Sequence, residues 1–368
     1  MRIVVAPDKF KGTLSAFEAA RAMAAGVAIA MPSAEVVVVA VSDGGEGFST
    51  ALLSHRGGET HNVSVRGPLG GPVAAPIGYL ADCVVLESAR ACGLGVVRAR
   101  DPLRASSTGV GDLVRHALED PHPPAAIVVG VGGTASTDGG TGAASALGWR
   151  FLDAAGDELS PGGAPLVDLH AVDAAGVDTR LGRQRVLAAC DVANPLVGPS
   201  GSAAVFAPQK GASPHDVVVL ERGLERLADV VSRDLGMDVA GLTHGGSGGG
   251  LGAGLAAFFG AELVSGFDYV ARQTRLEDEI ERADVVLTGE GRLDASTGRG
   301  KVVAGVVRLA HAAGARPVVV AGEIGTDAPV SITSSALCAG LLDRFGDAAR
   351  VDAVSSLTTA VSEVLATV

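Results

Sequence analysis

The sequence predicts an α/β protein in which a doubly wound parallel sheet is interrupted by a second α/β domain. Short apolar runs alternate with helical patterns at the start of the chain, and the same alternation returns from about residue 284. Between these parts, Gly-Pro pairs separate short alternating runs, a pattern typical of antiparallel strands. The length of 368 residues also favours two domains, because one domain ordinarily holds about 150. We therefore expect residues 1–60 and 266–368 to form the first domain and residues 61–265 to form an inserted one.

The first domain is expected to alternate strands with helices throughout. Each apolar run has the length of a buried strand, and each is followed by a helical pattern. Thr13 or Ser15 would cap the first helix, and Pro32 would end it. The expected strands span residues 2–6, 35–41, 284–287, 317–320 and 336–338, and the expected helices span residues 14–31, 48–54, 300–313 and from 353 onward.

The inserted domain is expected to combine antiparallel with parallel strands. Three alternating runs punctuated by Gly-Pro pairs lie between residues 60 and 86, which favours antiparallel pairing there. Further strands are expected over residues 127–129 and 185–189. The glycine-rich segment 245–254 is expected to be a loop.

Composition and charge narrow the classes of function. The net charge of −12 argues against a nucleic-acid partner and against an anionic membrane surface, because both require a basic face. The apolar stretches are far shorter than the roughly 20 residues of a membrane span, and Asp8 and Lys9 interrupt any signal-peptide core. The four cysteines lack the spacing of a metal site or a disulfide framework, so they are expected to be buried free thiols. We therefore expect a cytoplasmic protein that acts on small molecules, not on nucleic acid or membrane.

Charged residues follow the four best strands of the first domain. Ligands of an open parallel sheet bind beyond the carboxyl ends of its strands, so these residues are expected at one edge. Polar residues favour loops in any case, which explains any one of these acids but explains the whole set poorly. The residues are Asp8, Lys9 and Lys11 after the first strand, Asp43 and Glu46 after the second, Glu290, Arg292 and Asp294 after the third, and Glu323 after the fourth.

Lysine is scarce in this chain and lies close to glycine wherever it occurs. Only four of the 29 Lys and Arg residues are lysines, namely Lys9, Lys11, Lys210 and Lys301. An ammonium is a compact point charge that approaches a phosphate or carboxylate oxygen from one direction, whereas a guanidinium requires a planar fork. The distribution indicates anion-binding loops, with chance placement of so few residues as the alternative.

The common motifs for nucleotides and catalytic metals are incomplete. Gly300-Lys301 does not satisfy the Walker A pattern, and the scattered histidines support neither a zinc site nor a Ser-His-Asp triad. Residues 130–135 satisfy G-x-G-x-x-A after a strand, and Asp153 lies about 20 residues on, which is a weak dinucleotide fingerprint. Asp138 counts against it, because a pyrophosphate would meet its carboxylate. An NAD(P)-dependent oxidoreductase of a hydroxy acid and a non-catalytic ligand-binding protein both stay open on these motifs.

Polar residues also stand at strand and helix ends of the inserted domain. An aspartate such as Asp191 at a strand end can accept a hydroxyl proton, and Asp with Asn194 is a usual ligand pair for Mg²⁺. An Asx-turn before Pro195 explains the same residues at least as well. Ser106 and Ser107 precede glycines and would either donate hydroxyls to an anion or cap a helix.

A series of long motifs occurs in order over about residues 7–305. The motifs are residues 7–16 (PDKFKGTLSA), 43–47 (DGGEG), 105–111 (ASSTGVG), 132–140 (GGTASTDGG), 190–196 (CDVANPL), 208–212 (PQKGA) and 288–294 (TGEGRLD). They resemble motifs of the bacterial glycerate kinase family, the type with a flavodoxin-like domain, and they cover essentially the whole chain. Lys9 departs from the pattern, since the family more often has Ser there.

The resemblance implies a fold and a reaction. The fold is a flavodoxin-like domain interrupted by a second α/β domain, with the active site in the cleft between them. The reaction is ATP-dependent and Mg²⁺-dependent phosphorylation of D-glycerate to 2-phosphoglycerate or 3-phosphoglycerate, and residue patterns do not decide between these products. The resemblance leaves open whether the protein forms a homodimer.

Residue roles follow from residue type and motif position. Asp191 is the first choice to orient or deprotonate the attacking hydroxyl, and Asp8 is the second. Lys11 and Lys210 are expected to neutralise the transferred phosphoryl group or the glycerate carboxylate. The expected Mg²⁺ ligands are Asp43, Glu46 and Glu290, and the residues expected to bind glycerate or ATP are Lys9, Ser106, Ser107, Gly132, Gly133, Asp138, Asn194, Gln209, Arg292, Asp294 and Lys301.

Overall fold

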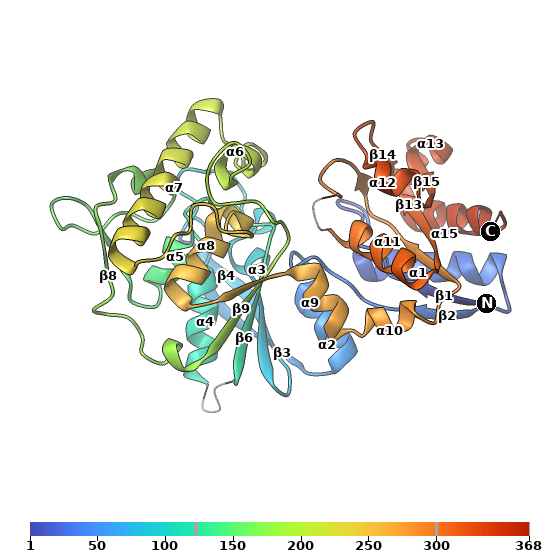
Figure 1. Ribbon diagram of the computed structural model, residues 1–368, viewed down its shortest axis with the longest axis horizontal. Helices are drawn as coiled ribbons and strands as arrows, with labels where there is room; N and C mark the ends of the chain where they lie inside the picture. Colours follow the sequence, from blue (N-terminus) through green and yellow to red (C-terminus); the bar gives the residue numbers. More distant parts are fainter. Residues whose placement is uncertain (121–123, 299–300, 368) are drawn as a thin grey trace. The chain divides into compact units, whose positions relative to one another are not determined.

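The computed structural model describes residues 1–120, 124–298 and 301–367 and resolves them into two compact units (Figure 1). The first unit comprises Met1–Asp43, Thr50–Arg56 and the chain from Phe267 onward. The second comprises Gly44–Ser49 and Gly57–Gly266. Helix α2 (Phe48–Arg56) therefore begins in the second unit and ends in the first. The boundaries expected at residues 60 and 266 stay a prediction about independently folding domains.

The first unit is built on a parallel sheet of five strands within the described residues. The strand order is β15-β13-β11-β1-β2, and every neighbouring pair is parallel. Numbered along the unit this is 2-1-3-4-5, the order of flavodoxin-like folds, so the expected fold class is confirmed. Figure 1 colours the N-terminal and C-terminal strands blue and red within this one sheet. The strands are β1 (Arg2–Val5), β2 (Glu35–Val38), β11 (Val285–Thr288), β13 (Arg316–Ala321) and β15 (Leu337–Gly340).

Helices cover both faces of this sheet, and the strand side chains alternate between the two covers. Ile3 and Val5 pack with helices α1 and α15, whereas Val4 and Ala6 pack with α9, α10 and α11. Both faces are buried, which explains why the strands are continuous apolar runs instead of alternating ones. The helices are α1 (Ala16–Ala30), α9 (Gly266–Gln273), α10 (Leu276–Ile280), α11 (Val302–Ala313), α12 (Val330–Thr333), α13 (Leu341–Phe345), α14 (Ala348–Val351) and α15 (Ala353–Leu365), and a small parallel pair joins β12 (Arg292–Leu293) to β14 (Glu323–Ile324).

Helix α1 shows how local sequence sets an element. The Ser15 hydroxyl accepts a hydrogen bond from the Glu18 N–H at 3.2 Å, and the Glu18 carboxylate accepts one from the Ser15 N–H at 2.8 Å. This capping box decides between the two caps expected for the helix, in favour of Ser15. Further along, a Cβ on Gly26 would lie 2.5 Å from the Thr358 carbonyl oxygen, so α1 approaches α15 too closely there for any side chain.

The second unit is built on a mixed sheet of six described strands, in the order β10-β9-β6-β5-β4-β3. Strands β10, β9, β6 and β5 are parallel, and β4 and β3 add to β5 as an antiparallel edge. The antiparallel runs expected between residues 60 and 86 are therefore confirmed. The strands are β3 (Glu59–Arg66), β4 (Pro72–Tyr79), β5 (Cys83–Glu87), β6 (Ala126–Val131), β9 (Arg185–Cys190) and β10 (Glu262–Ser265).

Six α-helices lie wholly within this unit in the described range. The glycine-rich segment 245–254 was expected to be a loop, which is wrong for its second half: α8 (Ser247–Phe259) continues as a helix after three left-handed glycines, Gly248, Gly249 and Gly250. The apolar residues that follow these glycines pack into the core, and that tertiary burial outweighs their low helix propensity. The remaining helices are α3 (Ser88–Cys92), α4 (Thr108–Glu119), α5 (Thr141–Ser145), α6 (Ser202–Phe206) and α7 (Pro214–Leu235), and a small antiparallel pair joins β7 (Arg150–Leu152) to β8 (Ala171–Asp173).

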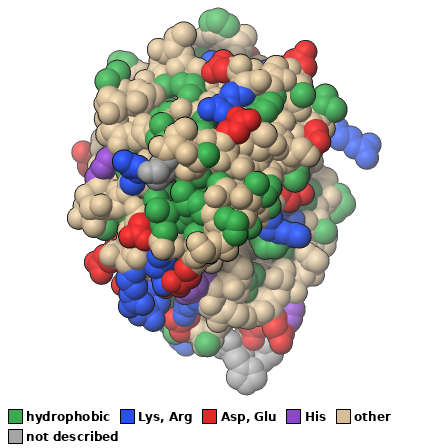
Figure 2. Space-filling view, turned by 90° about the vertical axis from the view of Figure 1, so that its right-hand side faces the viewer, with side chains coloured by type: hydrophobic (Ala, Val, Ile, Leu, Met, Phe, Trp, Pro, Cys, Tyr) green, Lys and Arg blue, Asp and Glu red, His purple; other side chains and the backbone are tan. Residues whose placement is uncertain are grey.

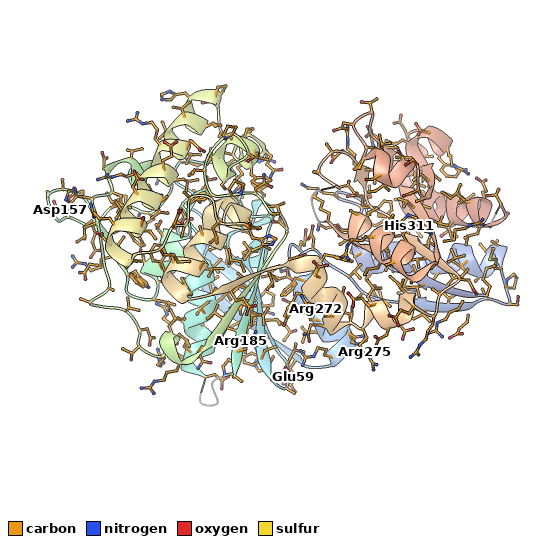
Figure 3. The ribbon with its side chains drawn as sticks, in the orientation of Figure 1. Glu59, Asp157, Arg185, Arg272, Arg275 and His311 are labelled. Atoms are coloured by element: carbon orange, nitrogen blue, oxygen red, sulfur yellow. The ribbon has the colours of Figure 1, made fainter. Side chains whose placement is uncertain are left out.

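Surface charges of both signs are interspersed on the face drawn in Figure 2. Exposed ion pairs include Arg185 with Glu262 at 3.1 Å and Arg275 with Asp278 at 2.8 Å, and Figure 3 labels both arginines. Such exposed pairs contribute little to stability. Among the helices that the structure describes, none is long and apolar enough to cross a membrane. Cys83, Cys92 and Cys190 are buried free thiols as expected, while Cys338 is partly exposed.

Candidate active site

Three acidic side chains lie beyond the carboxyl ends of neighbouring strands in the first unit. Asp8 follows β1, Asp43 follows β2 and Glu290 follows β11, and their exposed fractions are only 6%, 6% and 7%. Strands β1 and β11 flank the point where the strand order of a flavodoxin-like sheet reverses, which is where such folds bind ligands. The Asp8 N–H donates to the Gly289 carbonyl at 2.8 Å, which ties the two loops together. The structure thus brings these three predicted residues to one edge of one sheet.

Burial makes the carboxyl groups of Asp8 and Glu290 weaker acids than usual. Burial raises the pKa of Asp8 to about 6, and the negative charge of Asp43 adds to the rise, while Lys9 and Lys301 oppose it. Burial likewise raises the pKa of Glu290 to about 7 against a 2.6 Å hydrogen bond from the Thr297 hydroxyl. Negative charge is therefore in excess at this edge, and a bound cation would stabilise it.

Lysine side chains approach this acidic edge. The Lys9 ammonium lies 3.6 Å from the Asp8 carboxylate, and the Lys9 N–H donates to the same carboxylate at 2.7 Å. The Lys301 ammonium donates to the Ser296 hydroxyl at 2.7 Å and acts electrostatically on Asp8 and Glu290. Lys11 is exposed. Gly300, the first residue of the helix expected over residues 300–313, lies outside the described residues.

The other predicted site residues of the first unit, Arg292 and Asp294, follow β11 in the chain. The Asp294 carboxylate accepts hydrogen bonds from the Ser296 N–H at 2.8 Å and the Ser296 hydroxyl at 2.5 Å. Burial alone would raise the pKa of Asp294, but these bonds and the charges of Lys301 and Arg292 outweigh it and lower the pKa. Arg292 lies 3.2 Å from Glu323, so the strand-end charges expected at residues 292 and 323 pair with each other.

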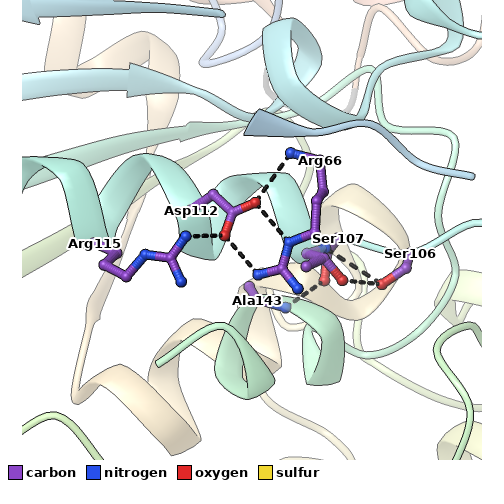
Figure 4. A network of polar contacts seen from close by, with 7 residues as sticks. Arg66, Ser106, Ser107, Asp112, Arg115 and Ala143 are labelled. Carbon is purple, nitrogen blue, oxygen red and sulfur yellow. Dashed lines mark hydrogen bonds and ion pairs between the residues drawn. The ribbon is translucent and has the colours of Figure 1, made fainter. Parts of the chain in front are cut away.

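In the second unit, the Asp138 carboxylate is fully buried and links two helices. Figure 4 labels Ser106 and Ser107, two of the residues that bond to it. It accepts hydrogen bonds from the Ser107 N–H at 2.7 Å and the Ser107 hydroxyl at 2.9 Å at the start of α4, and from Ser106 at 3.2 Å. It also accepts from the N–H groups of Gly140 and Gly142 at the start of α5, both at 3.2 Å. Ser106, Ser107 and Asp138 therefore satisfy one another inside the unit, and the ligand contacts predicted for them stay untested predictions.

Figure 4 also shows the Asp112 carboxylate on α4, which pairs with Arg66 at 2.6 Å and Arg115 at 2.9 Å. Burial alone would raise the pKa of Asp112, but the hydrogen bonds and charge of Arg66 lower it overall. This network joins α4 to the edge strand β3 and supports the fold, not the site.

Lys210 is a buried cation. Its side chain is 3% exposed, and its ammonium donates to the Thr134 hydroxyl at 3.3 Å and to the Ser136 carbonyl at 2.5 Å. Burial lowers the pKa of Lys210 to about 8, against the stabilising charges of Cys92, Asp138 and Asp191. Its neighbour Gln209 is exposed. The ammonium therefore lies under the loop that follows β6, while the predicted neutralising role stays a prediction.

Asp191 follows β9 and is held on both sides. One carboxylate oxygen accepts a hydrogen bond from the Ser247 hydroxyl at 2.6 Å. The other lies where a Cβ on Gly132 would be 2.6 Å away, so any side chain at position 132 would displace the carboxylate. The side-chain amide of Asn194 donates a hydrogen bond to the Ser200 carbonyl at 2.7 Å. Gly133 has φ +65°, a conformation that favours glycine, as the loop turns away from the strand.

Two residues at the strand-end edge of the second unit, Glu87 and Ser247, were not among the predicted site residues. Glu87 accepts hydrogen bonds from the N–H groups of Ser49 at 2.6 Å and Gly47 at 3.4 Å, so it caps the start of α2 from the end of β5. Burial raises the pKa of Glu87. Ser247 was hidden among glycines, and only its fully buried contact with Asp191 singles it out.

The predicted Mg²⁺ ligands do not form a ready-made site. Asp43 and Glu290 belong to the first unit, whereas Glu46 is exposed and belongs to the second. Across residues 1–120, 124–298 and 301–367, no group of three His, Cys, Asp or Glu side chains is arranged to hold a metal ion. The acidic edge of the first unit is the better fit to a cation, because its carboxylates are buried together.

Known proteins resemble this chain over nearly its full length. The family model described as the glycerate kinase family matches residues 3–367. A glycerate 2-kinase of Escherichia coli (strain K12) is 41% identical over 334 residues, 90% of this chain and 87% of the relative. A glycerate kinase of Bacillus subtilis (strain 168) is 40% identical over 331 residues, 89% of this chain and 86% of the relative. A crystal structure of a proposed glycerate kinase 2 from Salmonella typhimurium LT2 superimposes with a TM-score of 0.78 at 37% identity, covering 100% of this chain and 98% of that one.

The buried clamp around Asp138 predicts a large stability effect. Asp138→Asn replaces one acceptor oxygen by an N–H donor facing other donors, and we expect it to lower the free energy of unfolding by about 2–4 kcal/mol in chemical denaturation. Asp153→Asn is the matched control, because Asp153 also accepts two backbone N–H bonds but near the surface, and little change is expected. A fully stable Asp138→Asn protein that has lost nucleotide binding would instead assign Asp138 to the ligand.

The buried ammonium of Lys210 predicts a pH dependence of stability. Its pKa is about 8 in the folded protein against 10.5 for an ordinary lysine, so the unfolded chain binds more protons between these pH values. The free energy of unfolding of the wild type, relative to Lys210→Met, should therefore rise by on the order of 1–3 kcal/mol as the pH increases from 8 to 10.5. A difference between the wild type and Lys210→Met that does not change with pH would contradict the lowered pKa.

Proposed function

This chain belongs to the glycerate kinase family and is a glycerate kinase, and from that premise we propose that it transfers the γ-phosphoryl group of ATP to the 2-hydroxyl of D-glycerate with Mg²⁺. The observation that carries the proposal is the match to the family over residues 3–367. The choice of the 2-hydroxyl is supported by the E. coli relative, a glycerate 2-kinase that is 41% identical.

The reaction is an in-line displacement at phosphorus. The 2-hydroxyl oxygen of glycerate forms a bond to the γ-phosphorus, the bond from that phosphorus to the bridging oxygen breaks, and ADP leaves with the electron pair. The hydroxyl proton passes to a carboxylate base. Catalysis of such a transfer depends on positioning and on neutralising negative charge.

The acidic edge of the first unit fits Mg²⁺. Mg²⁺ keeps several waters and takes one or two carboxylates together with substrate phosphates, so a closed cage of three protein ligands is not required. Asp8, Asp43 and Glu290 offer buried carboxylates of which Asp8 is destabilised by the charge of Asp43, and Glu290 by that of Asp8. We propose that Mg²⁺ draws its protein ligands from this group, with Glu46 no longer among them. When bound, the ion neutralises charge on the phosphate oxygens.

Asp191 is the proposed base. Its side chain is partly exposed, so a substrate hydroxyl can reach it, and Ser247 and Gly132 fix its orientation. Asp8 is the alternative, because its pKa of about 6 is close to the range that suits a general base.

The lysines divide between substrate and structure in this proposal. Lys11 is exposed and is the candidate to bind phosphate or the glycerate carboxylate directly. Lys9 and Lys301 offset the acidic edge, at Asp8 and through Ser296. The buried ammonium of Lys210 holds the loop after β6. Direct ligand contacts of Gly132, Gly133, Asn194, Gln209, Arg292 and Asp294, and the cleft expected between two domains, stay predictions.

Product analysis tests the reaction. With ATP, Mg²⁺ and D-glycerate, the ³¹P NMR spectrum is expected to contain 2-phosphoglycerate. Substrate analogues sharpen the test: 3-hydroxypropanoate lacks the 2-hydroxyl and should not be phosphorylated, whereas D-lactate retains it and should be a slow substrate. 3-Phosphoglycerate as the product would overturn the 2-hydroxyl assignment and leave the kinase activity standing.

Substitution of the base tests the mechanism. Asp191→Asn preserves size and one acceptor oxygen but cannot take a proton, so kcat should fall by about 10²–10⁴-fold. Asp153→Asn, the same substitution outside the site, should leave kcat unchanged. Near-normal turnover of a folded Asp191→Asn protein would remove Asp191 as the base, and the same measurement on Asp8→Asn would then test the alternative.

A further inference from the structure

Ser247 is a buried hydroxyl placed between a backbone carbonyl and the proposed base. Its side chain is fully buried, and its oxygen lies 2.6 Å from an Asp191 carboxylate oxygen and 2.9 Å from the Val131 carbonyl oxygen. A hydroxyl carries one hydrogen, so it donates to one of these acceptors at a time. The Val131 carbonyl also accepts the Asp191 N–H at 3.1 Å. Of the two acceptors near the hydroxyl, the carboxylate is the closer and is negatively charged, so it is the favoured partner of the hydroxyl hydrogen.

The backbone around Ser247 is built for this placement. Gly248, Gly249 and Gly250 have φ values of 63°, 77° and 85°, so the chain turns left-handed directly after the serine. A Cβ on Gly249 would lie 1.9 Å from the Ser136 carbonyl oxygen, and one on Gly246 would lie 2.2 Å from the Pro195 carbonyl oxygen. Such close approach on both sides of the serine leaves its hydroxyl little freedom to move.

The contact with Ser247 engages one oxygen of the Asp191 carboxylate. The other oxygen lies over Gly132, where the missing Cβ leaves room for the carboxylate. Asp191 is partly exposed, although Ser247 is not. The hydroxyl therefore restricts the rotation of the carboxylate while Asp191 keeps access to solvent.

We propose that Ser247 is a positioning residue for phosphoryl transfer, which acts only through Asp191 by holding one oxygen of its carboxylate. The inference rests on the proposed function, in which Asp191 is the base. It also assigns the glycine segment 246–250 to holding Ser247 in place.

Ser202 provides a matched control for the loss of a buried hydroxyl contact in the glycine segment 246–250. Its side chain is likewise fully buried, and its hydroxyl donates to the Gly246 carbonyl at 2.9 Å, next to Ser247. Ser202→Ala therefore removes one buried hydroxyl contact from the same segment without touching Asp191. If Ser247 only stabilised the segment, the two alanine variants would behave alike.

A double-mutant cycle tests the proposal, using Ser247→Ala, Asp191→Asn and both together in the full chain. Ser247→Ala should lower kcat by about 10–100-fold with KM for both substrates within about threefold, because a misplaced base costs turnover and not binding. In the Asp191→Asn background the same substitution should change kcat by less than about twofold. Ser202→Ala should keep kcat within about twofold of the wild type. Thermal unfolding identifies any variant that does not fold. If Ser247→Ala does not fold, Ser247→Cys replaces it, because the thiol keeps a weak donor of similar size. An intermediate kcat is then expected.

The outcomes test the role of Ser247 separately from the role of Asp191 as the base. Additive losses in the double variant, or a raised KM with normal kcat, would overturn the role of Ser247 and leave Asp191 as the base. Equal losses in Ser247→Ala and Ser202→Ala would reduce Ser247 to a structural contact. Normal turnover of Asp191→Asn would remove the base and the positioning role together, while the identity of the ³¹P product would still stand on its own.

Discussion

The buried carboxylate of Asp138 is the interaction on which the second unit's strand-end edge depends. It gathers N–H groups from the starts of α4 and α5, which a buried helix end must otherwise leave unpaired. These hydrogen bonds also fix the position of Gly139, whose N–H donates to the Gly249 carbonyl at 3.1 Å. Gly249 in turn packs against Ser136 and the Lys210 ammonium, and two residues earlier Ser247 reaches Asp191. A structural carboxylate and the proposed base are thus connected through one run of close backbone contacts, so the packing of the fold sets the geometry of the site.

The first unit meets a different constraint, an excess of buried negative charge. Asp8 and Glu290 lie where the strand order reverses, and burial raises the pKa of both towards neutrality. Lys301 opposes the rise in pKa at both groups and Lys9 opposes it at Asp8, but burial outweighs them. Buried carboxylates in this state cost stability, and a bound divalent ion would recover it. A hydrophobic replacement would serve the fold better, which supports the proposal that these carboxylates bind a cation.

Sequence reasoning located the strands and their polar ends because apolar runs and the carboxyl-end rule depend on local pattern. It failed where tertiary packing decides. The glycines at 248–250 signal a loop, yet the apolar residues after them are buried and form a helix. Ser106, Ser107 and Asp138 carry the residue types of a ligand site, and only the structure shows them hydrogen-bonded to one another. Ser247 has no neighbour in sequence that marks it, since Asp191 is 56 residues away.

The four lysines illustrate how one compositional oddity can have several physical causes. Lys11 is exposed, Lys9 and Lys301 lie at the acidic edge, and Lys210 is buried without a carboxylate at hydrogen-bond distance among the contacts described. An arginine at position 210 would need partners for five N–H donors in a space that offers a hydroxyl and a carbonyl, whereas an ammonium needs three. At position 9 the compact ammonium lies 3.6 Å from the carboxylate of its own neighbour, Asp8. Local packing therefore accounts for lysine at position 210 and charge compensation for Lys9, while anion binding by the exposed Lys11 belongs to the proposed function.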